Sequence, residues 1–545
     1  MMARLGAVRR PPAWVLATVL LAIPFVVLAV RAVVGVDQSL SGDVSLIELR
    51  TRDVGTAHSP TLGSYGRYGF NHPGPLWFYV LALPYRLTGQ LAVGVLLVGV
   101  LSVAAILWVA ARRGGLWWAA LLTAVLVWAA GPAFVSDPWE PHGLVLPAAA
   151  LVLLTFDTAA GRAWSLPLVA GVASLLGAAQ ATLLPFAVAM GAAALWSARR
   201  HVRPLLAAGA VLLVLWSPTI WQQWTGEPTN ITQMRAARDD GSLSLGLGDA
   251  WAAVAIELGH APPWAGFDAP RDQFAGVLDV GAAPVVPIGA VALAFMLVRR
   301  RTPIVVVASV ATVAAVVGTS QLLGPLFVWI PEWLRVIGFG CWLAVGWSLA
   351  ARAPVAPLIG AALVVTLLTT YDAATYASED DYLGAAVRRL ATQLPPLDEP
   401  ILASSTVDGN LAFGGAFDGL EALVLVLDDR GVEAVVDPRL ADRFGPRRAE
   451  KKRARSREVI LVEADADDKP PGFTSVGLVD PLPAALRDER NRLLDELDLP
   501  ATASMRRVIL SIRGDARRTR IAERLLEIPD LPRVELLLSP DAARH

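Results

Sequence analysis

The chain has 545 residues, of which 55% are hydrophobic, and its mean hydropathy is +0.52. These values exclude an ordinary soluble protein of this length and predict a polytopic membrane protein. The net charge is −1, but the charged residues are unevenly distributed along the chain. The single cysteine, Cys341, excludes an internal disulfide and a cysteine-based metal site. No alternation of basic and aromatic residues indicates nucleic-acid binding.

Apolar segments of about 20 residues, the length that crosses a bilayer, recur through the first two thirds of the chain. The first follows Arg4, Arg9 and Arg10 and exceeds the apolar region of a signal peptide, so we interpret it as an uncleaved helix. The segments near 165–180 and 182–197 could instead form one tilted helix or a re-entrant hairpin. In total we predict about eleven transmembrane helices, near residues 14–34, 91–111, 116–134, 143–160, 165–180, 182–197, 204–221, 282–298, 303–319, 335–350 and 354–371.

Arginines gather in alternate short loops, which face the cytoplasm by the positive-inside rule. With eleven spans, this pattern places the N-terminus in the cytoplasm and the C-terminus outside a bacterial plasma membrane. The loop carboxylates fall almost entirely on the opposite side, so we expect carboxylate chemistry on the outer face. The arginines of this pattern are Arg4, Arg9, Arg10, Arg112, Arg113, Arg162, Arg199, Arg200, Arg203, Arg299, Arg300, Arg301 and Arg352.

The composition changes near residue 376, where apolar runs give way to charged sequence. We therefore predict a transmembrane domain over 1–375, with a first outer loop at 36–90 and a long outer loop at 222–281. Residues 376–545 are predicted to form a soluble extracytoplasmic α/β domain. Its expected strands lie at 401–404, 432–436, 459–462, 508–512 and 534–538, and its expected helices at 378–394, 412–429 and 483–497.

The first outer loop carries more charge than a connection between two helices needs. Asp43 follows Ser41 and Gly42 at the expected start of a short helix, and Glu48 stands four residues before Arg52. The structural interpretation makes Asp43 a helix N-cap and Glu48–Arg52 a surface ion pair. The functional interpretation makes Asp43 a general base that accepts a proton from an acceptor hydroxyl.

The first loop ends in the sequence His72-Pro73-Gly74-Pro75, which cannot continue a regular helix. The apolar segment that follows, residues 76–87, is too short to cross a bilayer and is predicted to be re-entrant or juxtamembrane. A rigid turn of this kind would hold His72 at the membrane surface. His72 is thus a candidate for substrate binding, with a purely structural turn histidine as the alternative.

The second outer loop contains Asp137, Glu140 and His142 within six residues. Carboxylate and imidazole groups could bind a divalent metal ion or position an acceptor, although their spacing matches no strong metal motif. The alternative is an interfacial turn anchored by Trp139.

Two further polar residues lie at the outer ends of apolar segments. Gln180 lies in an apolar run, where polar groups tend to face a cavity rather than lipid. Arg335 opens a span on the face where few arginines are expected, and a guanidinium is suited to phosphate oxygens. The alternative for Arg335 is an arginine that extends its head group to the interface.

The acid after the first span, followed by His72-Pro73-Gly74-Pro75 and LWFYVLALPYRLTG, resembles the GT-C superfamily of integral-membrane glycosyltransferases. The resemblance implies a polyprenyl-phosphate sugar donor, a cell-envelope glycan, lipid or protein acceptor, and transfer on the outer face. It further implies that Asp43 is the catalytic base of an inverting displacement, and that Arg335, with Arg67, holds the leaving phosphate. The scarcity of lysine indicates GC-rich coding and an actinobacterial source.

The candidates for substrate binding are Glu48, His72, Asp137, Glu140, His142 and Gln180. The sequence identifies no certain cofactor, although Asp137, Glu140 and His142 leave a divalent metal ion open. A transporter or flippase for a lipid-linked or polysaccharide intermediate is one alternative function, but it would favour polar residues within the spans and an internal repeat. A non-catalytic membrane scaffold is the other. No GxxxxGK[ST] motif indicates a nucleotide-driven pump.

Overall fold

The protein is known from a computed structural model, whose contacts divide the chain into two compact units. Met1–Val36, Pro60–Gln273 and Val277–Ser378 form the first, and Asp37–Ser59, Phe274–Gly276 and Glu379–His545 form the second. We call them the membrane unit and the C-terminal unit. The structure describes residues 12–35, 40–66, 68–239, 244–267, 272–274, 277–279, 285–327, 329–349, 354–377, 381–397, 399–405, 417–449, 457–464, 469–501, 503, 508, 516–529 and 531–540.

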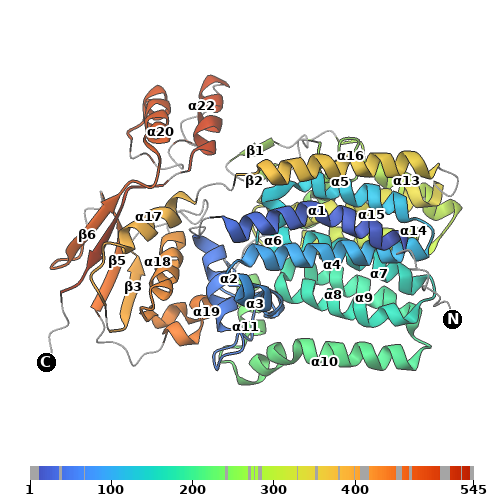
Figure 1. The fold of residues 1–545 in the computed structure, drawn as a ribbon, viewed down its shortest axis with the longest axis horizontal. Coiled ribbons are helices and arrows are strands. Elements are labelled where there is room, and N and C mark those ends of the chain that lie inside the picture. Colours follow the sequence, from blue (N-terminus) through green and yellow to red (C-terminus); the bar gives the residue numbers. More distant parts are fainter. Residues whose placement is uncertain are drawn as a thin grey trace, which may run out of the picture. The chain divides into compact units, whose positions relative to one another are not determined.

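Long apolar helices that run side by side build the membrane unit (Figure 1). Within the described ranges, 8 helices are long and apolar enough to cross a membrane. The predicted polytopic helical class is therefore confirmed. These helices are α1 (Ala13–Val34), α4 (Leu91–Arg112), α5 (Leu116–Ser136), the continuous pair α6 (Glu140–Gly143) and α7 (Val145–Ala159), η2 (Ala181–Leu183) with α9 (Leu184–Ala198), α10 (Val202–Thr225), α14 (Pro303–Ser320) and α16 (Val355–Thr375).

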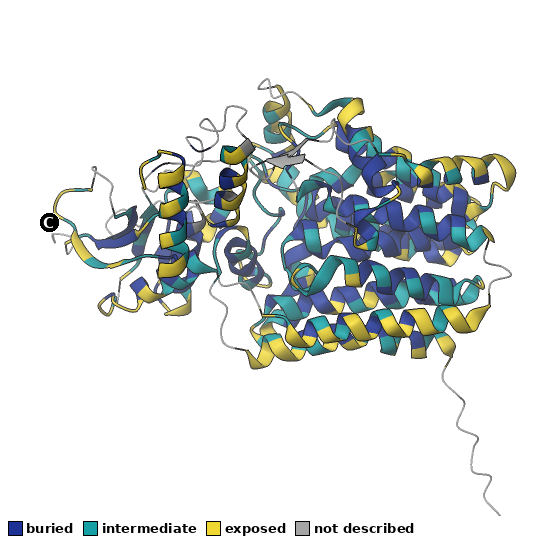
Figure 2. Ribbon diagram, turned by 90° about the horizontal axis from the view of Figure 1, so that it is seen from above, coloured by how far each residue is buried: buried dark blue, intermediate teal, exposed yellow. Residues whose placement is uncertain are grey.

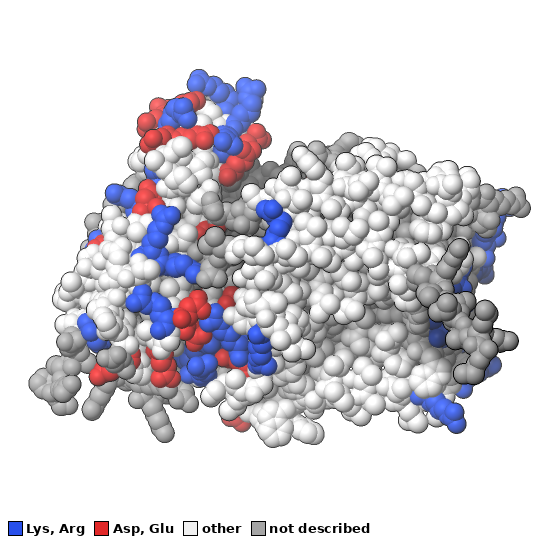
Figure 3. All heavy atoms as spheres, viewed as in Figure 1, with Lys and Arg blue, Asp and Glu red and all other residues white. Residues whose placement is uncertain are grey.

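The remaining three predicted spans are helical but shorter. They are α8 (Leu166–Ala179), α13 (Ile288–Arg299) and α15 (Arg335–Leu349), with 14, 12 and 15 residues. The uncertain pair predicted near 165–197 is resolved into two helices, α8 and α9, joined by the turn at Gln180. Figure 2 shows buried residues concentrated inside the bundle, while Figure 3 shows few charged side chains on the visible face of this unit.

The connections of the membrane unit carry short helices at the expected places. The segment after His72 forms α3 (Leu76–Thr88), which has 13 residues and packs against α4 and α8. The long outer loop contains α11 (Asn230–Asp239), α12 (Gly246–Glu257) and the short strands β1 (Asp272–Phe274) and β2 (Val277–Asp279). A 3-10 turn at Ile330–Leu334 leads directly into α15.

The C-terminal unit contains a five-stranded mixed sheet in the order β4-β3-β5-β7-β6. Strand β3 is parallel to β4 and β5, whereas β7 is antiparallel to β5 and β6. The strands are β3 (Ile401–Ser405), β4 (Ala434–Val435), β5 (Arg457–Glu463), β6 (Thr474–Val479) and β7 (Val534–Leu538). Four of the predicted strands are confirmed; of 508–512 only Val508 is described, and it is helical. Strand β6 was not predicted, because its half-exposed residues do not alternate clearly.

Helices α17 (Tyr382–Ala391) and α18 (Phe417–Asp429) share the main apolar core with the sheet. A separate small core joins α20 (Ala484–Glu496) to α22 (Ala516–Glu527). Sequence periodicity did not predict α22. The charged side chains visible in Figure 3 gather on this unit, as expected of a part that is surrounded by water.

A helix from the first outer loop, α2 (Gly42–Asp53), completes the C-terminal core. Leu46 and Leu49 are 5% and 0% exposed and belong to the same apolar cluster as residues of α17, α18 and β3. The structure therefore divides the chain differently from the linear boundary predicted at 375, which assigned all of 36–90 to the transmembrane domain. The reason is that the apolar side chains of α2 are buried by residues more than three hundred positions later.

We predict that Leu49→Ala destabilises the C-terminal unit by about 2–5 kcal/mol, because the deletion leaves a cavity in its core. Leu478→Ala is the matched control, since Leu478 is 51% exposed in the same unit. Thermal unfolding of the full chain, monitored by proteolysis of the C-terminal unit, measures the difference. Equal behaviour of the two variants would show that α2 is not part of this core.

Candidate functional site

The predicted site residues fall into two groups that belong to different units. Asp43 and Glu48 lie on α2 in the C-terminal unit, whereas His72, Asp137, Glu140, His142, Gln180 and Arg335 lie in the membrane unit. Arg67 lies outside the described residues. Each group is described within its own unit.

The loop before α3 is folded into a tight hairpin that carries His72. The N–H of His72 donates to the carbonyl of Ser64 (2.8 Å), and the N–H of Gly63 donates to the carbonyl of His72 (3.0 Å). The buried amide of Asn230 accepts from the N–H of Asn71 (3.0 Å) and donates to its carbonyl (2.8 Å). The backbone around His72 is therefore fixed from both sides.

The hairpin docks on the turn between α8 and η2. The N–H of Gly74 donates to the carbonyl of Ala178 (2.9 Å), and a Cβ at Gly74 would lie 2.7 Å from the Thr219 hydroxyl oxygen. Only glycine permits this approach. The N–H of Ala181 donates to Nδ1 of His72 (3.3 Å), so the ring is oriented by the same turn that contains Gln180.

His72 is held as a neutral imidazole. Burial lowers its pKa from the ordinary value of 6.5 to about 4. Because Nδ1 accepts a hydrogen bond, the proton of the neutral ring resides on Nε2, which can donate to a ligand. The ring can thus stabilise a phosphate or hydroxyl oxygen near neutral pH without carrying a charge.

Gln180 supplies an unsatisfied polar atom beside this ring. Its side chain is 4% exposed, and Oε1 is buried without a hydrogen-bond partner in the described part of the chain. Buried polar atoms are usually satisfied, so such an acceptor points to a missing donor such as a ligand hydroxyl or a water molecule. Sequence reasoning identified Gln180, and the structure places it one residue from the His72 contact.

Glu140 is buried within the membrane unit at the start of α6, where 2% of it is exposed. The hydroxyl of Ser64, from the His72 hairpin, donates to its Oε1. Glu140 therefore connects the first and second outer loops. Ser64 was not identified from sequence, because a single serine in a polar loop carries no recognisable pattern.

Asp137 and His142 bind each other. Asp137 follows the last residue of α5, and its Oδ2 lies 2.7 Å from Nδ1 of His142. Its Oδ1 accepts from the N–H of Trp139 (2.9 Å). Gly131, with φ 80° and ψ 166°, and Pro132 interrupt α5 just before this point, which bends the end of the helix. The loop therefore forms an ordered carboxylate–imidazole pair.

Arg335, the first residue of α15, reaches the same neighbourhood. Its Nε donates to Glu332 (2.5 Å), and its guanidinium carbon lies 5.2 Å from the centre of the Phe134 ring. That ring also contacts His142, at 4.2 Å between ring centres. Phe134 thus lies next to both predicted site residues, although it was not predicted itself.

Two separate sets of contacts hold predicted residues in the membrane unit. Ser64 joins the backbone of His72 to the side chain of Glu140. Phe134 lies next to both His142 and Arg335. Beside Phe134 lies a small apolar hollow lined by Val95, Gly99, Val127, Phe134, His142 and Leu146.

The metal interpretation finds limited support. Among the residues that the structure describes, no group of three or more His, Cys, Asp or Glu side chains could hold a metal ion. Asp137 and His142 pair with each other, while Glu140 bonds to Ser64. The donor set as it stands does not fit a resident divalent ion, and we assign no step to one.

On the C-terminal unit, Asp43 is exposed in the first turn of α2. The N-cap position belongs to Ser41, whose hydroxyl donates to Asp381 (3.0 Å), so the N-cap interpretation of Asp43 is wrong. Asp43 presents its carboxylate at the N-terminus of a helix that is otherwise buried.

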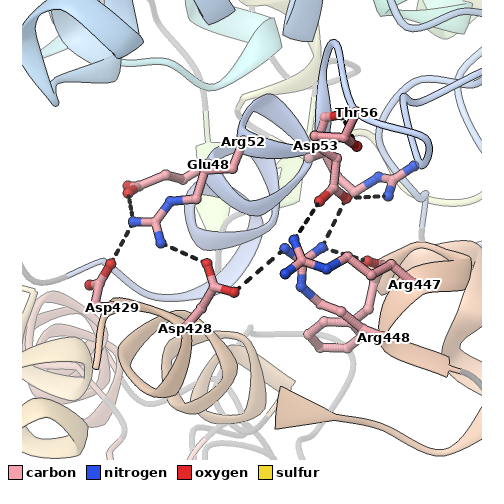
Figure 4. Close-up of polar contacts among 10 residues, drawn as sticks. Glu48, Arg52, Asp53, Thr56, Asp428, Asp429, Arg447 and Arg448 are labelled. Atoms are coloured by element: carbon pink, nitrogen blue, oxygen red, sulfur yellow. Dashed lines mark hydrogen bonds and ion pairs between the residues drawn. The ribbon is translucent and has the colours of Figure 1, made fainter. Parts of the chain in front are cut away.

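Glu48 has a structural role in the same helix. It is 8% exposed and pairs with Arg52 (2.5 Å), whose guanidinium also contacts Asp428 (2.8 Å) and Asp429 (2.6 Å) on α18 (Figure 4). These contacts favour the structural interpretation of Glu48 over the predicted role in substrate binding. The expected surface pair is in fact part of an extended ion network, which sequence spacing could not reveal.

Comparison with solved structures shows a shared fold. The chain is similar to ArnT from Cupriavidus metallidurans bound to undecaprenyl phosphate, with a TM-score of 0.51 and 14% sequence identity, covering 84% of this chain and 94% of that chain. The apo state of ArnT gives a TM-score of 0.51 and 14% identity, covering 83% and 93%. No family model and no curated protein matches the sequence.

The fold defines a multi-pass membrane protein of GT-C architecture with a small C-terminal sheet. The fold shared with ArnT confirms the GT-C fold predicted from the first loop. The actinobacterial type stays a prediction.

We predict that His72 makes the folded chain less stable in acid. The unfolded chain protonates this histidine near pH 6.5, whereas the folded chain resists protonation until about pH 4. Acidification through that window therefore favours unfolding, and the stability is recovered above it. Thermal unfolding at pH 7 and pH 4.5 should show a smaller loss in His72→Gln than in the parent chain. The exposed His201→Gln is the control, and an equal loss in His72→Gln would contradict the prediction.

Proposed function

We propose that the protein is a glycosyltransferase that transfers a monosaccharide from a polyprenyl-phosphate donor to a cell-envelope glycan, lipid or protein. The observation that carries the proposal is the pairing of Asp137 with His142 and the position of Arg335 next to the ring of Phe134, beside a small apolar hollow that Phe134 and His142 line. The shared fold supports it, since the crystal structure of ArnT contains undecaprenyl phosphate. Transfer is proposed on the outer face of a bacterial plasma membrane, with a cytoplasmic N-terminus.

In the proposed reaction, Asp43 takes the proton of the acceptor hydroxyl. The acceptor oxygen attacks the anomeric carbon, and the bond between that carbon and the phosphate oxygen breaks. Polyprenyl phosphate leaves, and a single displacement inverts the anomeric centre. The proton ends on Asp43 and is later lost to water.

The membrane unit is proposed to bind the donor head group. Arg335 offers a fixed guanidinium for phosphate oxygens, and the Nε2–H of His72 offers a neutral donor. Gln180 would accept from a sugar hydroxyl, which satisfies its buried oxygen. Asp137 orients His142 by holding Nδ1, so that Nε2 faces a ligand. Arg67 is proposed as a second phosphate contact.

We expect Asp43→Asn to lower glycosyl transfer by about a hundredfold or more, because the amide cannot accept the proton. Asp249→Asn is the matched control: Asp249 is also exposed in the first turn of a helix, α12. Product formation from a radiolabelled polyprenyl-phosphate sugar in membranes with equal protein content measures the effect. Full transfer by Asp43→Asn would overturn the enzymatic role of Asp43 and favour the transporter or scaffold alternatives.

We expect Arg335→Gln to raise the KM for the donor by about 10- to 100-fold, the range of a charge-assisted hydrogen bond. The KM for the acceptor should change little. Arg299→Gln is the control, because Arg299 also lies beside a phenylalanine ring, with its guanidinium carbon 5.5 Å from the centre of Phe295. An unchanged donor KM in Arg335→Gln would remove Arg335 from the proposed phosphate site.

A further inference from the structure

The C-terminal end of α2 is held by a buried carboxylate. Asp53, the last residue of the helix, is fully buried, and its Oδ2 lies 2.8 Å from Nη1 of Arg50 and 2.9 Å from Nη1 of Arg448 (Figure 4). Arg447 approaches the other oxygen at 3.6 Å. Arg448 is itself only 3% exposed and comes from a segment 395 positions later. We call these four residues the Asp53 cluster.

A second set of ion pairs fixes the side of the helix. Arg52 joins Glu48 on α2 to Asp428 and Asp429 at the end of α18. Asp428 also lies 4.0 Å from Nη2 of Arg448, so the two sets meet. The apolar face of α2 is buried at the same time, because Leu46 and Leu49 enter the C-terminal core.

A glycine permits the close approach of α2 to the segment that carries Arg447 and Arg448. Gly445, with φ 88°, follows α19 (Ala441–Phe444), and a Cβ at this position would collide with the guanidinium of Arg50. The other end of α2 is fastened as well, since Ser41 donates to Asp381 (3.0 Å), which in turn accepts from the N–H of Gly384 at the start of α17 (2.8 Å). Asp43 lies two residues from this contact.

We propose that the C-terminal unit is the device that positions the helix bearing Asp43, with Asp53 and Arg448 as positioning residues. The inference rests on the proposed role of Asp43 as base. Loss of the charge on Asp53 takes the nearest carboxylate from the buried Arg448, and breaking a buried ion pair is strongly unfavourable. The Asp53 cluster thus fixes the C-terminal end of α2, and a displaced base is a poor catalyst.

The first test measures the helix directly, without activity. Amide hydrogen exchange of residues 44–59 is followed in the full chain, in detergent micelles, for Asp53→Asn, Arg448→Gln and the double variant. We expect exchange to accelerate by about tenfold or more in each single variant, and the double variant to show less than the combined effect. Arg439→Gln is the matched control, because Arg439 is exposed in the same unit and pairs with Asp437 beside it. Unchanged exchange would overturn the proposal.

The second test keeps every charge in place. Gly445→Ala should accelerate exchange in α2 by displacing Arg50, whereas Gly431→Ala should not. Gly431 also has a positive φ of 73°, but a Cβ there has nothing within 4 Å, so it controls for a side chain at a positive φ that meets no neighbour. Equal hydrogen exchange in α2 for both variants would show that the close approach of Gly445 to Arg50 does not hold α2 in place, and the proposed positioning would be rejected. This pair remains informative even where Asp53→Asn fails to fold.

The third test separates positioning from a purely structural role. Folded variants of the Asp53 cluster should lower kcat by about tenfold or more and leave the donor KM unchanged, because the proposed donor residues belong to the membrane unit. Arg448→Lys, which retains the charge, should recover part of kcat. A rise in donor KM with unchanged kcat would contradict positioning. Asp43→Asn could retain activity while the variants of the Asp53 cluster still accelerate hydrogen exchange in α2. In that case the positioning of α2 by the Asp53 cluster is supported, and the role of Asp43 as base is overturned.

Discussion

The buried carboxylate of Asp53 is the constraint on which the C-terminal unit depends. Without charge on Asp53, the buried Arg448 would lose its nearest carboxylate, and breaking a buried ion pair is strongly unfavourable. This ion pair, together with Leu46 and Leu49, makes a helix that begins eight residues after the first membrane span an integral part of a core formed mainly by residues beyond 381. The C-terminal unit is consequently not an independent attachment to the membrane helices, because its fold requires a segment from the beginning of the chain.

Burial has a different effect in the membrane unit. Desolvation there lowers the pKa of His72, and the turn at Ala181 selects which ring nitrogen carries the proton. The histidine is thereby held as a neutral donor. The guanidinium of Arg335 pairs with Glu332, and the ring of Phe134 lies next to both Arg335 and His142.

The candidate base and the candidate donor residues belong to different units, and this division has a consequence for the kinetics. In the proposed reaction, substitutions in the C-terminal unit would act on the helix of Asp43, whereas substitutions around Phe134 would act on donor binding. Under this proposal, chemistry and donor binding could be altered separately. This separation also gives the C-terminal unit a role within the proposed reaction that does not require it to bind a glycan of its own.

The sequence by itself determined the class of the protein, the positions of its apolar helices and the GT-C resemblance, because hydrophobic length and local motifs are properties of neighbouring residues. It also made His72, Asp137, His142, Gln180 and Arg335 candidate site residues, since polar groups next to apolar spans are conspicuous, and their roles stay predictions. Only the tertiary structure decided that α2 belongs to the C-terminal unit, that Glu48 forms an ion pair with Arg52, and that Ser41 rather than Asp43 occupies the N-cap. Those features depend on contacts such as Asp53–Arg448, between residues 395 positions apart, and no local pattern records such a pairing.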